Sequence, residues 1–454
     1  MLLLVLAAPF LLIPCTPAQT GIRFEITQSP MGNLSVNVDP RTKRISPNGT
    51  RWMFVERKNN RFALIVNGVR GKEYESISRN NIKFSPDGRK IAFEAKRGNQ
   101  AFIVVDEVEG KAFDAILPFS LQFSPDTKRL MYAARRGNKF LMVVDHKEGK
   151  EYDNINQFFI TFSPDSKKIG YFAQLAGKWF VVIDGVESAA YDKVSSASFS
   201  PDSNHVAFIA GRDNKDFTVI DGVEGENHDI VEGLTFAPDS RHMAFFAFDR
   251  DDRGLRLIAS GRESRKYDGF IGAPVFSPDS AHVAFIASRG DNQLVNLDDV
   301  EGEAYLRIGG LIFSPDSKRL AYGANKNGAQ IIVTDKQESS GYDEIGLPSL
   351  MFSPDSRHIA FAAVKNGDSV LVFDGQESKK YQQIDQPAFT PDSKYLLYLA
   401  KKGQSSDVLV INKSESKSFK LFDRKIFFDS AREIRILTSV KEKVISVKVT
   451  FYEN

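Results

Sequence analysis

The chain has 454 residues, of which 42% are hydrophobic and 26% are charged, and its formal net charge is +2. This composition is typical of a soluble protein that is long enough to bury a large core. The balance of charge argues against a general nucleic-acid-binding or membrane-surface protein, so no nucleic acid is expected as a partner.

Residues 1–18 are predicted to be a signal peptide. Their apolar run, residues 2–13, is shorter than the about 20 residues that a membrane-spanning helix needs. Small residues lead up to a predicted cleavage after Ala18. The sequence therefore predicts an exported protein, periplasmic or secreted, without a transmembrane anchor.

Cys15, the only cysteine, lies inside this segment. Pro14 directly before it fits the cleavage box of a lipoprotein poorly, so a lipid anchor at Cys15 is not expected. Once the signal peptide is removed, the mature chain has no thiol. That excludes a disulfide, a cysteine nucleophile and a zinc–thiolate site.

Residues 19–44 are predicted to form one or two N-terminal strands, because 22–26 and 34–38 both alternate between apolar and polar residues. The C-terminal end of the chain shows only three strand patterns, at 425–428, 433–438 and 444–451. We hypothesise that the N-terminal strand supplies a fourth. Such pairing of the two ends would remove exposed strand edges.

From residue 45 to residue 454 the chain repeats one unit, with a spacing of 37 to 40 residues. The mark of the unit is Phe-Ser-Pro-Asp or a near copy, with its proline at Pro86, Pro125, Pro164, Pro201, Pro238, Pro278, Pro315, Pro354 and Pro391. Degenerate copies at 46–49 and 428–430 flank these. A fixed period of this length indicates a repeat architecture.

Each unit is predicted to be a sheet of four short antiparallel strands. Proline and aspartate form the first turn, a polar tip the second, and an Asp-Gly type sequence the third. Aromatic residues recur at fixed positions and are interpreted as packing between units. Such sheets bury both faces only by stacking on their neighbours, and radial stacking of four-stranded sheets is a propeller.

The sequence therefore predicts an all-β fold, a β-propeller of about eleven four-stranded units. Because propellers typically have about four to eight blades, we favour two rings over one wide ring.

The unit resembles the WD-like Pro-Asp repeat of TolB-type β-propellers, best seen in Phe-Ser-Pro-Asp-Ser-Lys-Lys-Ile at 162–169. The resemblance covers nearly the whole mature chain and implies the propeller fold. It implies little about function, because the fold hosts enzymes, receptors and scaffolds. TolB-like proteins also carry an N-terminal α/β domain, whereas only residues 19–44 precede the repeats, so the TolB partner and role are not carried over.

No catalytic or cofactor motif is present: the chain lacks Gly-x-Ser-x-Gly, a phosphate loop and His-Glu-x-x-His. The Ser-Pro-Asp carboxylates are interpreted as bonding to turn amides. Four histidines share one register: His205, His242, His282 and His358. Since other units carry Lys or Arg there, we expect an exposed basic position rather than a metal site, and neither a metal nor a cofactor is expected.

The second-turn tips are the candidate binding surface. They are rich in Lys and Arg, whereas the opposite face carries the Pro-Asp and Asp-Gly turns, so the ring is expected to be polarised. The tips near the N-terminus are the most basic, and the candidate residues are Arg57, Lys58, Arg61, Lys96, Arg97, Arg135, Arg136 and Lys139.

These patterns favour an exported, non-enzymatic scaffold that binds through its loop faces and central mouth. The expected partner is a protein or an anionic polymer of the cell envelope or extracellular space. The alternative is a propeller enzyme, a lyase or hydrolase, with its site at the central opening. A secreted glycoprotein is a third possibility, because Asn33, Asn48 and Asn412 begin glycosylation sequons.

Overall fold

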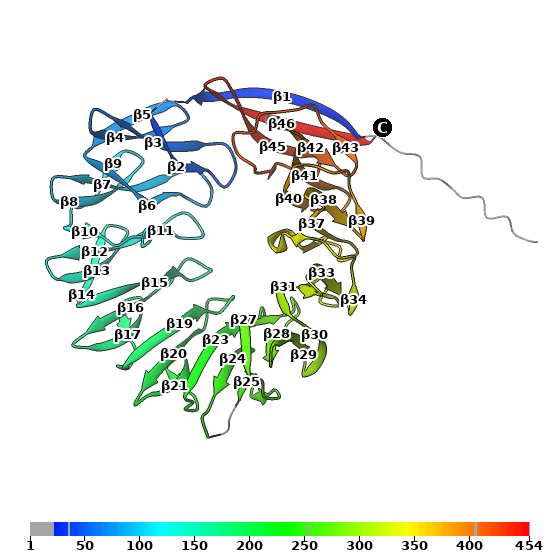
Figure 1. Cartoon of the computed structure of the whole chain (residues 1–454). Coiled ribbons are helices and arrows are strands. Elements are labelled where there is room, and N and C mark those ends of the chain that lie inside the picture. The colour runs from blue at the N-terminus through cyan, green and yellow to red at the C-terminus, as the bar shows by residue number, and fades with distance from the viewer. Residues whose placement is uncertain (1–21, 35–36, 252–253, 404–405, 454) are drawn as a thin grey trace, which may run out of the picture.

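A computed structural model describes residues 22–34, 37–251, 254–403 and 406–453, and these residues form a ring of sheets around an open centre (Figure 1). There are eleven antiparallel sheets, the blades, each built from four strand positions. The predicted all-β propeller is thereby confirmed. One short 3₁₀ helix, η1 (Leu347–Ser349), is the only helix in the described residues.

From the innermost strand outward, blades 1 to 4 are as follows. Blade 1 contains β2 (Val38–Ile45), β3 (Trp52–Lys58), β4 (Arg61–Val66) and β5 (Val69–Tyr74). Blade 2 contains β6 (Ser76–Phe84), β7 (Ile91–Arg97), β8 (Gln100–Val105) and β9 (Val108–Glu109). Blade 3 contains β10 (Ala115–Ile116), β11 (Gln122–Phe123), β12 (Leu130–Arg136), β13 (Lys139–Val144) and β14 (Lys147–Tyr152). Blade 4 contains β15 (Asn154–Phe162), β16 (Ile169–Leu175), β17 (Lys178–Ile183) and β18 (Val186–Glu187).

Blades 5 to 8 have the same order. Blade 5 contains β19 (Lys193–Phe199), β20 (Val206–Arg212), β21 (Lys215–Ile220) and β22 (Val223–Glu224). Blade 6 contains β23 (Ile230–Phe236), β24 (Met243–Phe248), β25 (Leu255–Ala259) and β26 (Arg262–Glu263). Blade 7 contains β27 (Gly269–Phe276), β28 (Val283–Arg289), β29 (Asn292–Leu297) and β30 (Val300–Tyr305). Blade 8 contains β31 (Arg307–Phe313), β32 (Leu320–Lys326), β33 (Ala329–Thr334) and β34 (Gln337–Glu338).

Blades 9 to 11 complete the ring. Blade 9 contains β35 (Glu344–Ile345), β36 (Met351–Phe352), β37 (Ile359–Lys365), β38 (Asp368–Phe373) and β39 (Gln376–Glu377). Blade 10 contains β40 (Gln383–Phe389), β41 (Leu396–Lys401), β42 (Asp407–Ile411) and β43 (Ser414–Glu415). Blade 11 contains β44 (Phe427–Phe428), β45 (Glu433–Val440), β46 (Lys443–Glu453) and β1 (Ile22–Asn33).

The blades form one ring, so the prediction of two rings is wrong. The chain passes once around the centre, and the blue and red ends of the ribbon meet in Figure 1. Buried hydrophobic clusters join neighbouring blades at most seams. At the seam between blades 5 and 6, where the described residues form no such cluster, β19, β20 and β21 lie against β23. The prediction of two rings was based on the four to eight blades of typical propellers, and it did not consider that each blade can pack against the next all the way around one ring.

The chain ends share blade 11. β1 pairs antiparallel with β46, with Ile22 opposite Glu453 and Phe24 opposite Phe451. The alternating Ile22, Phe24 and Ile26 pack against the cluster that contains Phe451, while the residues between them face solvent. A strand from one terminus and three from the other thus hold the ring closed.

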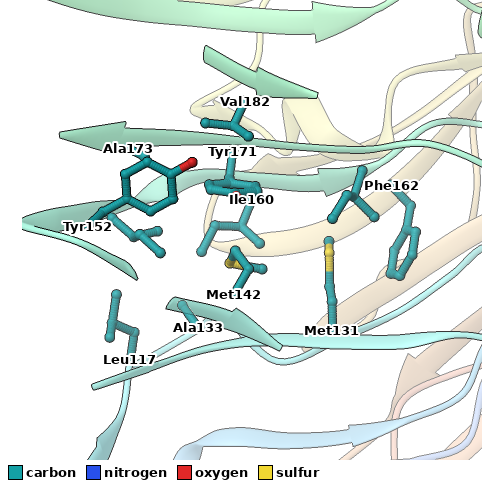
Figure 2. Close-up of a cluster of buried hydrophobic side chains, with 12 residues drawn as sticks. Leu117, Met131, Ala133, Met142, Tyr152, Ile160, Phe162, Tyr171, Ala173 and Val182 are labelled. Carbon is teal, nitrogen blue, oxygen red and sulfur yellow. The ribbon is translucent and has the colours of Figure 1, made fainter. Parts of the chain in front are cut away.

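Aromatic side chains fill the seams between blades. In Figure 2, Tyr152 of β14 lies among side chains of blades 3 and 4, and its ring meets that of Tyr171 edge-on at 6.1 Å. The same contact recurs between Tyr74 and Phe93 at 5.8 Å. The interpretation of the recurrent aromatics as packing between units is confirmed, and each buried ring is worth about 3 kcal/mol or more of stability.

The predicted signal peptide and Cys15 lie outside the described residues. Within the described ranges, no helix combines the length and the apolar character that crossing a membrane requires.

Candidate binding surfaces

The eight basic residues predicted as a binding rim lie on three neighbouring blades. They stand at the tips of the hairpins β3–β4, β7–β8 and β12–β13, in blades 1, 2 and 3. The structure therefore places them at the same end of adjacent sheets.

Half of these cations have carboxylate partners within the protein. Arg97 forms a two-pronged ion pair with Glu109 at 3.0 and 3.2 Å. Lys139 lies 2.5 Å from Asp153, and Arg61 lies 3.9 Å from Glu75.

Arg136 is held by Glu148 and Glu151, at 2.8 and 3.6 Å. Hydrogen bonds from Arg136 and then from Lys111 lower the pKa of Glu148 to about 2. The arginine is therefore matched by a carboxylate that is ionised at any physiological pH.

This ion pair is part of a latch that recurs around the ring. The cation ends the second strand, and the carboxylate lies 12 residues later on the outermost strand, as in Arg212–Glu224, Arg289–Glu301, Lys326–Glu338 and Lys365–Glu377. The guanidinium of Arg289 stacks on Tyr267 of the preceding blade, whose hydroxyl donates to Glu301 at 3.0 Å. The latch thus joins adjacent blades.

Four members of the predicted rim are left for binding: Arg57, Lys58, Lys96 and Arg135. None of them has a carboxylate within ion-pair distance in the part of the chain that the structure describes. Arg57 bonds to the Asn60 side chain, and Arg135 to the carbonyl oxygen of Gly137. Binding by the rim stays a prediction that rests on these four.

The opposite face carries the Ser-Pro-Asp turns, whose carboxylates bond as predicted. In blade 4, Ser163 Oγ donates to Asp165 Oδ1 at 2.6 Å, and the backbone N–H of Lys167 donates to the same oxygen at 3.1 Å. The backbone N–H of Asp165 donates to Ser203 Oγ of blade 5 at 2.9 Å. The motif therefore closes its own turn and ties it to the next blade.

These turns predict an acid-sensitive contribution to stability. The hydrogen bond from Ser163 and the N–H of Lys167 lower the pKa of Asp165 from 3.8 to about 2. Because the folded-state pKa is depressed, ionised Asp165 stabilises the fold above about pH 4, and this contribution is lost as the pH falls toward 2. We expect Asp165→Asn to lower the melting temperature at pH 6 and to match the wild type near pH 2.

A suitable control is Asp291→Asn, at an exposed hairpin tip. Its melting temperature should follow that of the wild type at both pH values. If Asp165→Asn changes the melting temperature equally at pH 6 and pH 2, the carboxylate makes no ionisation-linked contribution.

The four histidines of the shared register each contact an aspartate. His205 Nδ1 lies 2.6 Å from Asp221, and His358 Nδ1 lies 2.6 Å from Asp374. Arg129 makes the equivalent contact with Asp145 in blade 3, at 2.9 Å. The position therefore pairs a basic side chain with the third-turn carboxylate of its own blade, except in blade 6, where His242 contacts Asp239 of the first turn at 2.6 Å.

The innermost strands, which face the open centre in Figure 1, break the repeat most strongly. Their pairing with the second strand is interrupted at a different length in different blades, for example between Ile77 and Ile82 in blade 2 and between Asn156 and Ile160 in blade 4. In blade 3 the strand is divided into β10 and β11. Residues in these interruptions are free of the ladder and vary from blade to blade.

Two large aromatic side chains in these interruptions are exposed. Phe119 in blade 3 is 58% exposed, and Phe158 in blade 4 is 87% exposed. Phe158 is followed by Phe159, which is buried against Phe172. A nearly bare phenyl ring beside a buried one contributes nothing to the core.

Phe119 is also held in an unfavourable conformation, with φ of 63°. Its segment is fixed by neighbours: Asn81 Nδ2 of blade 2 donates to the carbonyl oxygen of Leu117 at 3.0 Å, and Ser120 Oγ donates to the same oxygen at 2.7 Å. A left-handed conformation at a bulky residue costs about 1–3 kcal/mol and is typical of functional positions.

Cations stand on the innermost strands of the two preceding blades. Arg41 and Arg79 are exposed and share one carboxylate, Asp39, at 3.0 and 3.4 Å. The guanidinium of Arg44 donates to the carbonyl oxygens of Arg41, Lys43 and Arg79, and makes no ion pair in the described ranges. The three guanidinium groups therefore outnumber the one carboxylate, which two of them contact. We call Arg41, Arg44, Arg79, Phe119 and Phe158 the inner-wall patch.

The sequence analysis did not predict this patch, because it considered only the positions at which the repeat units have similar residues. The available signal lay in the residues that the repeats do not share, such as the Phe158-Phe159 pair and the arginines Arg41, Arg44 and Arg79 shortly before the first turn.

One seam also departs from the latch. Between blades 5 and 6 the aromatic position holds His228, whose Nδ1 lies 2.9 Å from Asp249, and Asp249 in turn lies 2.9 Å from the buried Arg256. Arg256 also contacts Glu263 at 3.1 Å. Burial raises the pKa of Asp249, but hydrogen bonds from His228 and Arg256 outweigh it and hold that pKa below its usual value.

The fold and these surfaces define the chain as an eleven-bladed β-propeller. No family model matches the sequence, and no curated protein matches it either. Many solved structures do match.

Three such structures illustrate the range. A eukaryotic initiation factor is 15% identical, with a TM-score of 0.41 over 73% of this chain and 96% of that one. TolB from Acinetobacter baumannii is 12% identical, with a TM-score of 0.25 over 62% and 79%. A GH74 enzyme from Niastella koreensis is 9% identical, with a TM-score of 0.29 over 90% of both chains. At these values the comparisons give no information about function.

Proposed function

We propose that this protein is an exported, non-enzymatic scaffold that binds another protein of the cell envelope or extracellular space through the inner-wall patch. The observation that carries the proposal is the exposure of Phe158, together with the strained, exposed Phe119 in the preceding blade. Large exposed aromatic side chains are typical of binding surfaces.

The composition of the patch favours a protein partner over an anionic polymer. Aromatic and arginine side chains are the residues most enriched in the cores of protein interfaces and among their hot spots. The phenyl rings offer apolar contact without a polar atom to orient a sugar. The surplus of guanidinium groups over Asp39 suits a segment that carries acidic as well as apolar side chains.

The four rim cations without carboxylate partners, Arg57, Lys58, Lys96 and Arg135, belong to the same part of the ring, blades 1 to 3. Charges of one sign around a binding site speed encounter with an oppositely charged partner, especially at low salt. In this proposal the rim steers an acidic partner and the inner wall holds it.

The test is capture from an envelope or secretome extract by residues 19–454, followed by affinity measurement with the captured protein. In Phe119→Asn/Phe158→Ser, we expect the affinity to fall by roughly 30-fold or more, as for loss of interface hot spots. Asparagine tolerates the left-handed conformation at 119, so the melting temperature should not fall.

The matched variant is Lys58→Glu/Lys96→Glu on the rim. It should slow association at low salt and change the dissociation rate little. If the inner-wall variant retains every captured partner at wild-type affinity, or if nothing is captured, the inner wall is not the binding surface.

A further inference from the structure

A cavity of about 230 Å³ lies in the seam between blades 8 and 9. Its polar lining is Arg307, Asn325 and Gln330 of blade 8, and its apolar lining includes Gly323, Ile345 and Leu347. It is separate from the inner-wall patch, which belongs to blades 1 to 4.

The cavity lies where blade 8 has glycine at a strand position that holds a bulky residue in several other blades. The strand position of Gly323 is occupied by Phe172 in blade 4, Phe246 in blade 6 and Leu399 in blade 10, as the strand registers show. Leu347 of η1 fills part of this space, with its Cδ2 2.2 Å from where a Cβ of Gly323 would stand. The rest stays open.

The polar end of the cavity lacks a negative charge. Arg307, Asn325 and Gln330 lie opposite one another on three adjacent strands. The guanidinium of Arg307 donates to the carbonyl oxygen of Leu306 and has no carboxylate partner in the described ranges. Asn325 Oδ1 is buried and accepts no hydrogen bond there.

In blade 5 the equivalent row of residues contains both a cation and a carboxylate, which form an ion pair. The equivalent residues are Lys193, Gly211 and Asp216, in the same register. The Lys193 ammonium lies 2.6 Å from the buried carboxylate of Asp216. In blade 8 the cation is retained as Arg307, but Gln330 stands in the place of the aspartate.

We propose that the cavity binds a small aliphatic monocarboxylate. The carboxylate of the ligand takes the role that Asp216 has in blade 5, pairing with Arg307, and the Asn325 amide turns its Nδ2 toward the same group. The alkyl chain lies against Gly323, Ile345 and Leu347. Since a cavity of roughly 150 Å³ holds benzene, this one suits an acid of about five to eight carbons.

The experiment measures binding of hexanoate, hexanol and hexylamine to residues 19–454 by calorimetry or NMR. We expect saturable binding of hexanoate and at least tenfold weaker binding of the alcohol and the amine. Arg307→Gln should reduce hexanoate affinity to that of hexanol.

A second variant tests the comparison with blade 5. Gln330→Asp supplies an internal acid for Arg307 and keeps an acceptor for the N–H of Ile345, which Gln330 Oε1 now binds at 2.8 Å. It should therefore fold normally and bind hexanoate at least tenfold more weakly. Arg241→Gln, an exposed charge change in blade 6, should leave binding unchanged.

The proposal is overturned if hexanoate shows no saturable binding to the wild type. It is equally overturned if hexanol binds as well as hexanoate, or if Arg307→Gln and Gln330→Asp both retain wild-type affinity.

Discussion

Removal of β1 is expected to open the ring and to lower the melting temperature by at least about 5 °C. Ile22, Phe24 and Ile26 bury one face of this strand against the cluster that contains Phe451. Burial of three such side chains is worth roughly 5 kcal/mol. Deletion also leaves β46 as an exposed edge, which favours association between chains. Thermal unfolding and size-exclusion chromatography of residues 34–454 measure both effects.

Two point variants test whether the buried face of β1 stabilises the closed ring, without shortening the chain. Phe24→Asp puts a charge on the buried face of β1 and should reproduce most of the destabilisation. Thr27→Asp puts the same charge on the exposed face and should be nearly neutral, because its side chain points to solvent. If the two variants melt at the same temperature, burial of β1 does not hold the ring closed.

The second large effect is expected at the seam between blades 5 and 6. Asp249→Ala removes the carboxylate that faces both His228 and Arg256, and Arg256 is only 8% exposed at its side chain. The variant leaves Arg256 buried with Glu263 as its remaining carboxylate partner. We expect it to lower the free energy of unfolding by about 3 kcal/mol, which is at the lower end of the range for broken buried ion pairs. Urea unfolding at pH 7 measures the loss of free energy of unfolding.

Glu263 provides the matched control, because it contacts the same Arg256 but is 54% exposed. Glu263→Ala should cost less than about 1 kcal/mol, as exposed ion pairs do. The double variant Asp249→Arg/Arg256→Leu gives blade 6 the residues that blade 7 has at the same positions, Arg289 and Leu294. It should be more stable than Asp249→Ala. Equal destabilisation by Asp249→Ala and Glu263→Ala would show that burial does not set the strength of this network.

The turn chemistry was predictable because it is local. The serine, proline and aspartate of most first turns lie within a few residues, so their hydrogen bonds follow from the sequence alone, as with Ser163 and Asp165. The ion pairs of the rim cations were harder to predict from the sequence. Arg97 and Glu109 are brought together by a sheet of three strands, although their 12-residue spacing recurs along the chain and is a usable signal.

The inner-wall patch and the cavity depend on contacts between blades and were not predicted. Whether Phe158 is exposed depends on Phe159 occupying the space against Phe172. Whether Gly323 leaves a cavity depends on how far Leu347 of the next blade reaches. Neither fact is present in a single unit of the repeat.

By itself, the sequence determined the unit and the number of its copies, because strand alternation and turn residues act over a few positions and recur at a fixed period. It also determined which aromatics pack between units. Only the tertiary structure decided that eleven blades close into one ring. The angle between neighbouring blades is set by how side chains such as Tyr152 and Met142 fill each seam, and small differences in that packing add up around the circle.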